Sequence, residues 1–348
     1  MRNASRLRVC LVLVVPFVAS VSFPSRASAQ AADAIGVRAQ GMGGAFTAVA
    51  DDATASWWNP AGMAGGAYFN ALLESGNHRE PPADRTAAGD VRAQRAETRS
   101  FSVAFPALAV SYYRLRISEI QPQTSIAGAT GVRQEGGATE VRLRSIVMTQ
   151  VGASVGQSLG SHLVIASTLK LVHAGAASQL QAAGTASLDA ADGLTVSGET
   201  HPGLDIGAMA VLGPARIGVM VRNVKQPEFG SGADAFTLSR QARVGVAVSS
   251  GTRGVIGAAT VAVDADLMNT ATVFGDERRL AAGGELWTTG RTFGVRGGAS
   301  VNTIDDRRTA LSAGLSVALK KGLYADGEVS GGTDLGRRGW SAGLRVTF

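Results

Sequence analysis

The sequence contains one cysteine in 348 residues, Cys10, which lies near the amino terminus. The rest of the chain therefore has no internal disulfide bond and no thiolate metal site. Histidines are also few: His78, His162, His173 and His201. None of them has the spacing of metal ligands. We expect no metal and no cofactor.

Aromatic residues are scarce as well, with 11 Phe, 4 Trp and 4 Tyr. This leaves few aromatic rings for a hydrophobic binding pocket or for aromatic girdles at a membrane surface. Glycine, in contrast, is abundant at 45 residues. In a strand-rich chain, that excess indicates tight turns and closely packed sheet rather than linkers.

Residues 1–29 have the pattern of a secretory signal peptide. A charged start is followed by the apolar stretch Val9–Val21, which is too short for a spanning helix, and by the cleavage pattern Ala27-Ser28-Ala29. The segment carries four of the 33 basic residues and none of the 27 acidic ones, so 29 basic residues face 27 acidic ones in the remainder. A net charge of +2 predicts no nucleic-acid partner.

Apolar residues recur at every second position through much of residues 66–348. In Arg243–Ser249, for example, Val244, Val246 and Val248 share one face and Arg243 lies on the other. A period of two indicates strands with one apolar and one polar face. We count about fourteen such segments.

The connections between these segments alternate between short and long. Single residues such as Pro106 and Gly290 separate some segments, whereas others are separated by stretches such as Ala176–Pro202. An even strand number with alternating connection lengths predicts an all-β, 14-stranded antiparallel transmembrane barrel in contact with outer-membrane lipid. The competing architecture is a soluble β-sandwich, whose apolar faces would point inward.

The stretch before the first strand, residues 30–65, is irregular. Asp51 or Asp52 is expected to cap a short helix over Ala53–Trp58, and Asn59 before Pro60 to end it. Glycines at 41, 43 and 44 permit close approach or positive φ angles. Because a barrel of this width is not filled by its own side chains, we expect residues 30–65 to form a plug in the lumen.

The sequence GVRAQGMGGAFTAVADDATASWWNPAGMA resembles the amino-terminal signature of the FadL/PorV superfamily of outer-membrane barrels. The matching positions include Gly41, Gly43, Gly44, Asp51, Asp52, Asn59, Pro60 and Ala61. Asp264–Leu267 (DADL) and Gly284–Trp287 (GELW) are similar to PorV-type barrels. The resemblance implies a fourteen-strand barrel with the Asn-Pro-Ala segment inside it as a hatch.

The resemblance leaves two functions open. FadL-type members carry long-chain fatty acids or other hydrophobic compounds across the outer membrane, whereas PorV-type members take part in protein secretion. We expect passive passage of a small hydrophobic molecule, fatty-acid-like or aromatic, past the plug. The alternative is a scaffold that binds secretion-system proteins through its long loops.

Two glycine motifs give no support to an enzyme. Gly41–Phe46 lacks the third glycine of a dinucleotide fingerprint. Gly152–Gly156 matches G-x-S-x-G, but a turn and a strand follow it instead of the helix that a nucleophile elbow needs. We expect no catalytic residues.

Five charged residues are predicted to face the lumen from neighbouring strands: Arg243, Asp264, Asp266, Glu285 and Arg296. Opposite charges among them could pair across the wall and anchor the plug. Alternatively, they are solvated in a wet lumen.

The third strand departs from the alternation. Leu108, Val110 and Tyr112 share a face that Arg114 continues, while Tyr113 begins an apolar run on the other face. A change of face requires a bulge or a bend. FadL-type barrels have a kink in this strand that opens a lateral door, so we predict a bulge near Tyr112–Arg114. The alternative is a strand that rises above the membrane there.

Overall fold

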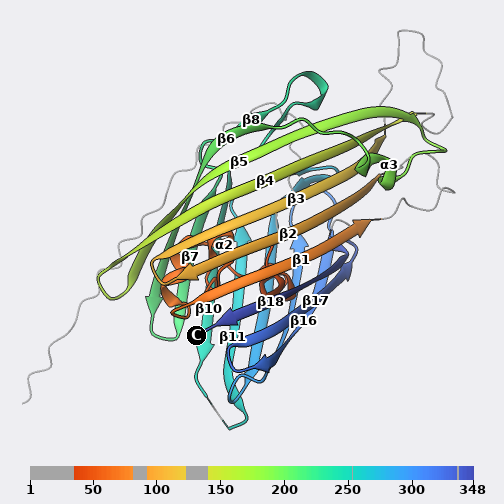
Figure 1. Cartoon of the computed structure of the whole chain (residues 1–348). Helices are drawn as coiled ribbons and strands as arrows, with labels where there is room; N and C mark the ends of the chain where they lie inside the picture. The colour runs from red at the N-terminus through yellow and green to blue at the C-terminus, as the bar shows by residue number, and fades with distance from the viewer. Residues whose placement is uncertain (1–34, 81–91, 123–139, 253, 335–336) are drawn as a thin grey trace, which may run out of the picture.

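The computed structural model describes residues 35–80, 92–122, 140–252, 254–334 and 337–348. The predicted signal peptide, residues 1–29, and the first residues of the predicted plug, 30–34, lie outside the described residues. The chain forms one closed antiparallel barrel of fourteen strands (Figure 1), in which β1 pairs with β18 to complete the ring. The predicted all-β barrel and its strand number are confirmed.

The barrel strands have the following bounds: β1 (Asn70–Glu80), β2 (Ala93–Phe105), β3 (Leu108–Pro122), β4 (Glu140–Leu159), β5 (Leu163–Ala182), β6 (Glu199–Leu212), β7 (Ala215–Arg222), β10 (Gln241–Ser250), β11 (Ile256–Asp266), β14 (Arg279–Thr288), β15 (Phe293–Asn302), β16 (Thr309–Lys320), β17 (Leu323–Gly332) and β18 (Gly339–Thr347). Two small hairpins lie in the connections, β8 (Glu228–Phe229) with β9 (Phe236–Thr237), and β12 (Thr270–Thr272) with β13 (Gly275–Glu277). The helices are α1 (Val37–Gly41), α2 (Ala55–Trp58), α3 (Leu188–Asp192) and the 3₁₀ helices Pro60–Gly65 and Gly232–Asp234.

Short and long connections lie at opposite rims of the barrel. The short-turn rim carries connections such as 106–107 and 213–214, and the long-loop rim carries connections such as 183–198 and 223–240. In barrels of the outer-membrane type, the short turns are periplasmic and the longer loops are extracellular. The rim to which a wall residue is nearer therefore indicates whether the residue lies toward the periplasmic or the extracellular side of the membrane.

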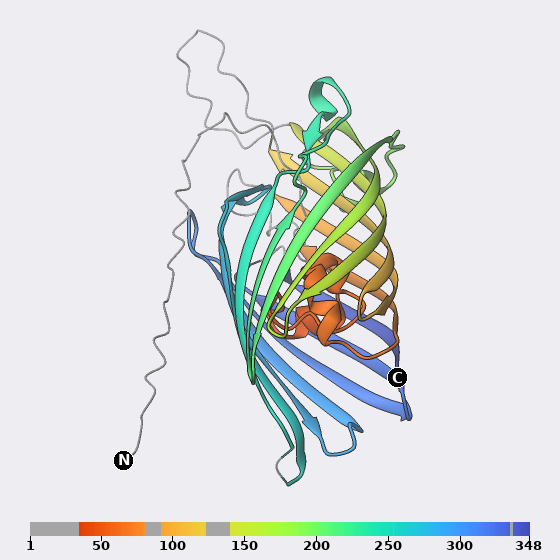
Figure 2. The ribbon, with the colours of Figure 1, turned by 90° about the vertical axis from the view of Figure 1, so that its left-hand side faces the viewer.

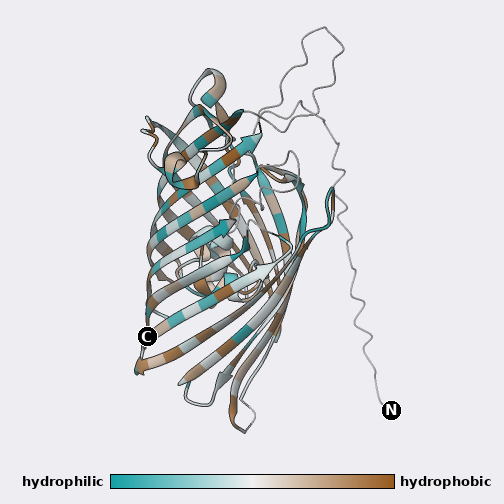
Figure 3. Ribbon diagram, turned by 90° about the vertical axis from the view of Figure 1, so that its right-hand side faces the viewer, coloured by the Kyte–Doolittle hydropathy of each residue, from teal (hydrophilic) through white to brown (hydrophobic). Residues whose placement is uncertain are grey.

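Apolar side chains point outward. Val246 and Val248 on β10 are about half exposed, Leu311 on β16 is 66% exposed, and the residues that alternate with them face the lumen. Figure 3 shows the alternation as bands along the strands. An outward apolar face suits lipid and excludes the β-sandwich, whose apolar faces would be buried. Among the described residues, every helix is too short or too polar to cross a membrane.

The predicted bulge near Tyr112–Arg114 is wrong. Strand β3 pairs without a register shift from Leu108 to Ile120 with β2, and from Leu108 to Pro122 with β4. Tyr113 and Leu115 are buried in the lumen, and Arg114 is exposed outside. The polarity of the two faces reverses because the lumen is apolar at this height, so this strand provides no kink for a lateral door.

A small second core covers part of the outer wall. Helix α3 and the chain beside it lie against the outer face of β2, β3 and β4 near the long-loop rim (Figure 1). Leu188 and Ala191 pack there on outward-facing Ile120 and Leu143. Arg95 forms ion pairs with Asp189 and Asp192 that fix this cover.

Candidate functional site: the lumen and the segment inside it

The amino-terminal segment lies within the barrel (Figure 2), where its helices are surrounded by the strands. We call residues 35–66 the lumenal segment. Most of its side chains are buried, and Phe46 and Trp58 pack edge to face at its centre. Apolar residues of the wall, such as Leu72 and Ala262, complete this main core of the molecule.

The local conformation of the lumenal segment follows from its turn-forming residues. Gly43 and Gly44 have φ angles of 68° and 85°, which glycine adopts without strain. Asn59 is extended, ends α2 before Pro60, and accepts a hydrogen bond from the Ala61 amide. The helix begins at Ala55, two residues later than predicted, and Asp52 accepts hydrogen bonds from the Thr54 amide and hydroxyl instead of capping the helix directly.

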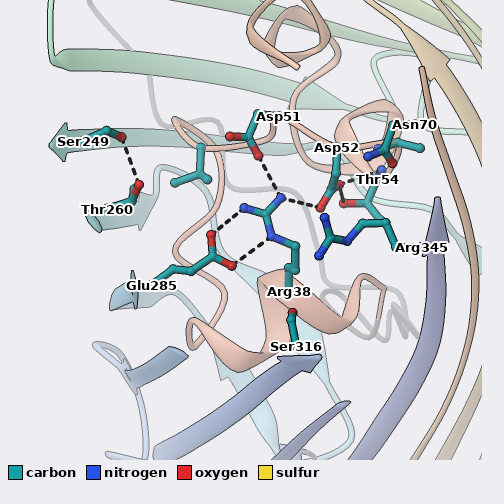
Figure 4. Close-up of polar contacts among 12 residues, drawn as sticks. Arg38, Asp51, Asp52, Thr54, Asn70, Ser249, Thr260, Glu285, Ser316 and Arg345 are labelled. Atoms are coloured by element: carbon teal, nitrogen blue, oxygen red, sulfur yellow. Dashed lines mark hydrogen bonds and ion pairs between the residues drawn. The ribbon is translucent and has the colours of Figure 1, made fainter. Parts of the chain in front are cut away.

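Arg38 links the lumenal segment to the wall (Figure 4). Its guanidinium donates two hydrogen bonds to Glu285 on β14, at 3.0 and 2.7 Å. A third nitrogen lies 2.8 Å from Asp51 and 2.9 Å from Asp52. One cation thus joins three carboxylates, of which Asp52 and Glu285 are buried and Asp51 is partly exposed.

The charge state of Arg38 is set by this cluster. Burial by itself would lower the pKa of the guanidinium, but the negative charge of Glu285, and then those of Asp51 and Asp52, raise the pKa well above its ordinary value. Arg38 is therefore charged at neutral pH. Breaking the Arg38–Glu285 pair lowers the stability of the folded protein, because the remaining partner would be a buried charge without compensation.

The remaining predicted lumen charges lie on the same side of the barrel wall. Arg296 lies 3.7 Å from Glu285 and 3.3 Å from Asp326, and Arg345 lies 2.9 Å from Asp326. Arg243 pairs with Asp266 at 2.6 Å. Asp264 accepts hydrogen bonds from the Phe46 and Thr47 amides of the lumenal segment. The structure therefore places these side chains in pairs and contacts rather than isolated in solvent.

Inward-facing glycines of the wall also hold the lumenal segment, and the sequence pattern did not single them out. A Cβ atom at Gly218 would lie 2.9 Å from the Asn59 side-chain nitrogen, and one at Gly298 would overlap the Met42–Gly43 backbone. A Cβ at Gly41 of the segment itself would lie 2.7 Å from the Arg296 side chain. The available signal was glycine at inward positions of otherwise regular strands.

A narrow apolar cavity lies between the lumenal segment and the long-loop rim. Its volume is about 20 Å³, and it is lined mainly by apolar side chains: Trp57, Leu115, Ile117, Ile146, Met148, Phe236 and Leu238. Phe236 comes from the β8–β9 hairpin, which folds over the lumen and packs with Ile117 and Ile146. The apolar face of β3 that seemed out of phase is one wall of this cavity.

A few polar groups border the cavity. Lys170 lies 2.7 Å from Asp205 and 2.8 Å from Asn223. Arg222 lies over the Trp57 ring at 4.2 Å and donates to the Trp57 carbonyl. The side-chain nitrogen of Gln150 is buried and has no hydrogen-bond partner among the described residues. An apolar pocket with a few convergent polar groups is typical of a small-molecule site.

A second cavity lies on the opposite side of the lumenal segment, toward the short-turn rim. Its volume is about 290 Å³, and its lining is mostly polar, including Arg38, Asp51, Asn70, Thr260, Glu285 and Arg345. The lumenal segment therefore separates a small apolar cavity from a larger polar one.

The model of a family described as "F plasmid transfer operon, TraF, protein" matches residues 66–266. The chain belongs to this family. The match begins at the end of the lumenal segment and runs through β11. No curated protein matches the chain.

Solved structures similar to this TraF-family barrel include proteins named as a hydrocarbon channel and a toluene transporter. The chain is similar to the CymD monoaromatic hydrocarbon channel, with a TM-score of 0.61 and 13% identity over 92% of this chain and 99% of that one. It is also similar to the Ralstonia pickettii toluene transporter TbuX, with a TM-score of 0.51 and 13% identity over 91% of this chain and 99% of that one. A Pseudomonas aeruginosa FadL homologue is similar with a TM-score of 0.53 and 9% identity over 94% of this chain and 99% of that one. These likenesses agree with the fold, a closed antiparallel barrel of fourteen strands. The resemblance to the PorV-type branch stays a prediction.

Asn59→Ala is expected to loosen the lumenal segment of this family member. The Asn59 side chain donates to the Thr47 and Ala208 carbonyls and accepts from the Ala61 amide. At about 1 kcal/mol for each hydrogen bond, the free energy of unfolding should fall by about 3 kcal/mol. Urea unfolding in detergent micelles measures it. Asn59→Asp keeps the acceptor for Ala61 but turns a carboxylate oxygen toward the Thr47 and Ala208 carbonyls, so it should be at least as unstable as Asn59→Ala. If either variant were as stable as the unaltered protein, the role given to Asn59 would be contradicted.

Proposed function

We propose that the protein is a passive outer-membrane channel for small hydrophobic molecules, aromatic or fatty-acid-like. The observation that carries the proposal is the apolar cavity in the lumen, which Trp57 of the lumenal segment and Phe236 of the long-loop side both line. The similar structures named as a monoaromatic hydrocarbon channel and a toluene transporter support it.

In this proposal the lumenal segment is the plug. A molecule enters from the long-loop side, rests against Trp57 and Leu115, and leaves through the polar cavity on the short-turn side. The apolar cavity, at about 20 Å³, holds about one water molecule, so an aromatic ring requires side chains to move. Phe236 belongs to a two-residue strand in a loop, and its displacement needs no change in the barrel wall.

A secretion or scaffold role is the second candidate. The name of the matching family refers to a plasmid transfer operon. Among the described residues, the cavity between the lumenal segment and the long-loop rim has a volume of only about 20 Å³. Such a role would use the long loops as a binding surface for secretion-system proteins and would require no movement of the lumenal segment.

Filling the cavity tests the channel directly. Ile146 is 2% exposed and lines the cavity. Ile146→Trp is expected to lower the uptake of radiolabelled toluene and octanoate at least tenfold, because the larger ring occupies the space that the permeant needs. Uptake is measured in a bacterial host without its own hydrophobic channels, with folded protein quantified in its outer membrane.

Val151→Trp is the matched control, since Val151 lies on the same strand but is half exposed on the outer face. Uptake by this variant should match that of the unaltered protein. If the unaltered protein gives no uptake of either compound above the empty host, the channel proposal fails. Co-purification with a secretion-system protein would then support the second candidate.

A further inference from the structure

The outer wall carries a basic groove where the apolar surface of β2 and β3 ends. It has a volume of about 240 Å³ and is lined by Glu97, Arg99, Arg114 and Arg116. Arg99 and Arg114 are exposed. Neither has a hydrogen bond or an ion pair with any residue that the structure describes. The groove plays no part in the lumenal path.

The register of the two strands makes this arrangement unfavourable without a counter-ion. Arg99 lies directly opposite Arg114 on the neighbouring strand. Like charges in directly opposite positions destabilise an antiparallel pair. Arg116 is opposite Glu97, and one of its nitrogens donates to the Asp192 carbonyl, 2.9 Å away. The groove therefore retains a net charge of +2, concentrated on Arg99 and Arg114.

The surroundings of the groove indicate the kind of counter-ion that it faces. One step toward the short-turn rim, Phe101 lies opposite Tyr112 on the same outward face, and these rings are 49% and 38% exposed. Aromatic rings of this kind lie at the level of the lipid headgroups in membrane barrels. The two arginines follow on the long-loop side, which is the outer-leaflet side. The α3 cover begins just beyond them.

We propose that this groove binds a phosphate group of an outer-leaflet lipid, with Arg99 and Arg114 as a two-sided clamp and the acyl chains along the apolar wall below. Guanidinium groups bind phosphate through paired charge-assisted hydrogen bonds. A phosphate between the two arginines would remove their mutual repulsion. The inference is independent of what the lumen transports.

The test measures binding of lipid A to the purified full-length barrel in a neutral detergent. Bisphosphorylated lipid A is compared with its dephosphorylated form by microscale thermophoresis. Arg99→Gln/Arg114→Gln should weaken binding of the phosphorylated lipid about 30-fold at low salt, since each basic residue near the headgroups contributes about fivefold. The dephosphorylated lipid should bind the variant and the unaltered protein equally.

The matched control is Arg307→Gln/Arg338→Gln, which removes two exposed arginines near the same rim. This variant should bind phosphorylated lipid A within about threefold of the unaltered protein. Equal weakening by both double variants, or equal affinity for both lipids, would overturn the proposal. Displacement by millimolar inorganic phosphate would also overturn it, because the site would then take a free anion.

A melting experiment separates binding from a merely structural role. Without lipid, Arg99→Gln/Arg114→Gln should melt at the same temperature as the unaltered protein or higher, because the repulsion is gone. With phosphorylated lipid A, the unaltered protein alone should gain stability. A variant that melts lower in both conditions would show that the arginines support the fold and bind no lipid.

Discussion

Arg38→Met is expected to release the lumenal segment from the barrel wall. The substitution leaves Asp51, Asp52 and Glu285 without the cation that they share. Breaking a buried ion pair on one side typically removes about 3–5 kcal/mol of stability, because the remaining charges are uncompensated. Since the strands have their own backbone ladders, the loss should fall on the lumenal segment first.

Two measurements check this result. Proteolysis of the folded protein in micelles should cut Arg38→Met within residues 35–66 at least tenfold faster than the unaltered protein, while the barrel strands stay protected. In planar bilayers the variant should also show more frequent ion-conducting openings than the unaltered protein. Arg307→Gln, which removes an exposed charge, is the control. Unchanged proteolysis would mean that Arg38 is not an anchor.

Arg38→Met/Glu285→Met refines the interpretation. Removing the wall carboxylate together with the cation should recover part of the stability, because one buried charge fewer is left unpaired. The stability of Arg38→Lys should lie between those of Arg38→Met and the unaltered protein. Its ammonium group keeps the charge but cannot contact Glu285 and both aspartates at once, as the planar guanidinium does. A double variant less stable than Arg38→Met would argue against a direct pair.

Gly298→Val is expected to displace the lumenal segment by steric overlap alone. A Cβ atom at Gly298 would overlap the carbonyl carbon of Met42 and the amide nitrogen of Gly43. Backbone on both sides cannot move aside as a flexible side chain could, so the loss of stability should reach about 3 kcal/mol, at the upper end for overpacked sites. Urea unfolding and the same proteolysis experiment measure the effect.

Gly297→Val provides a control one residue away. Gly297 faces outward, and a Cβ atom there would meet only the Ser312 carbonyl oxygen at 3.8 Å, an ordinary contact. Valine also suits a strand facing lipid. This variant should therefore fold and resist protease like the unaltered protein. If both valine variants behaved alike, close approach at Gly298 would not hold the segment.

Together these contacts describe a segment that is held from several directions at once. Three kinds of contact act on different parts of residues 35–66: the ion pairs of Arg38, the hydrogen bonds that backbone amides donate to Asp264, and the close contacts at Gly218 and Gly298. For the proposed channel, this means that permeants pass by small side-chain movements around Trp57 rather than by expulsion of the whole segment.

Some features of the fold followed directly from local sequence. The alternation in Arg243–Ser249 places Val246 and Val248 outside because successive side chains of a strand point to opposite faces. Asn59 before Pro60 ends α2 because proline excludes helical geometry from the preceding residue. Strand lengths were harder to predict: β4 and β5 each run for 20 residues, beyond the apolar alternation, since backbone pairing continues where the side chains turn polar.

Other features depended on what each residue meets. The predicted bulge in the third strand assumes an apolar face that points outward throughout. In the structure, Tyr113, Leu115 and Ile117 point into an apolar part of the lumen instead. The β8–β9 hairpin, with two residues in each strand, carries no periodic signal, yet Phe236 covers the cavity. The helix start moved to Ala55 because Asp51 and Asp52 are drawn to Arg38.

Local sequence patterns are sufficient to predict the barrel, its fourteen strands and the irregular segment before them, because strand period, turn residues and connection lengths are local properties of the chain. The pairing of charges, the glycines that touch the lumenal segment and the place of the apolar cavity depend on the closed ring. Arg38 and Glu285 are 247 positions apart, and their contact exists only because the closed ring surrounds the segment. No local pattern encodes that distance.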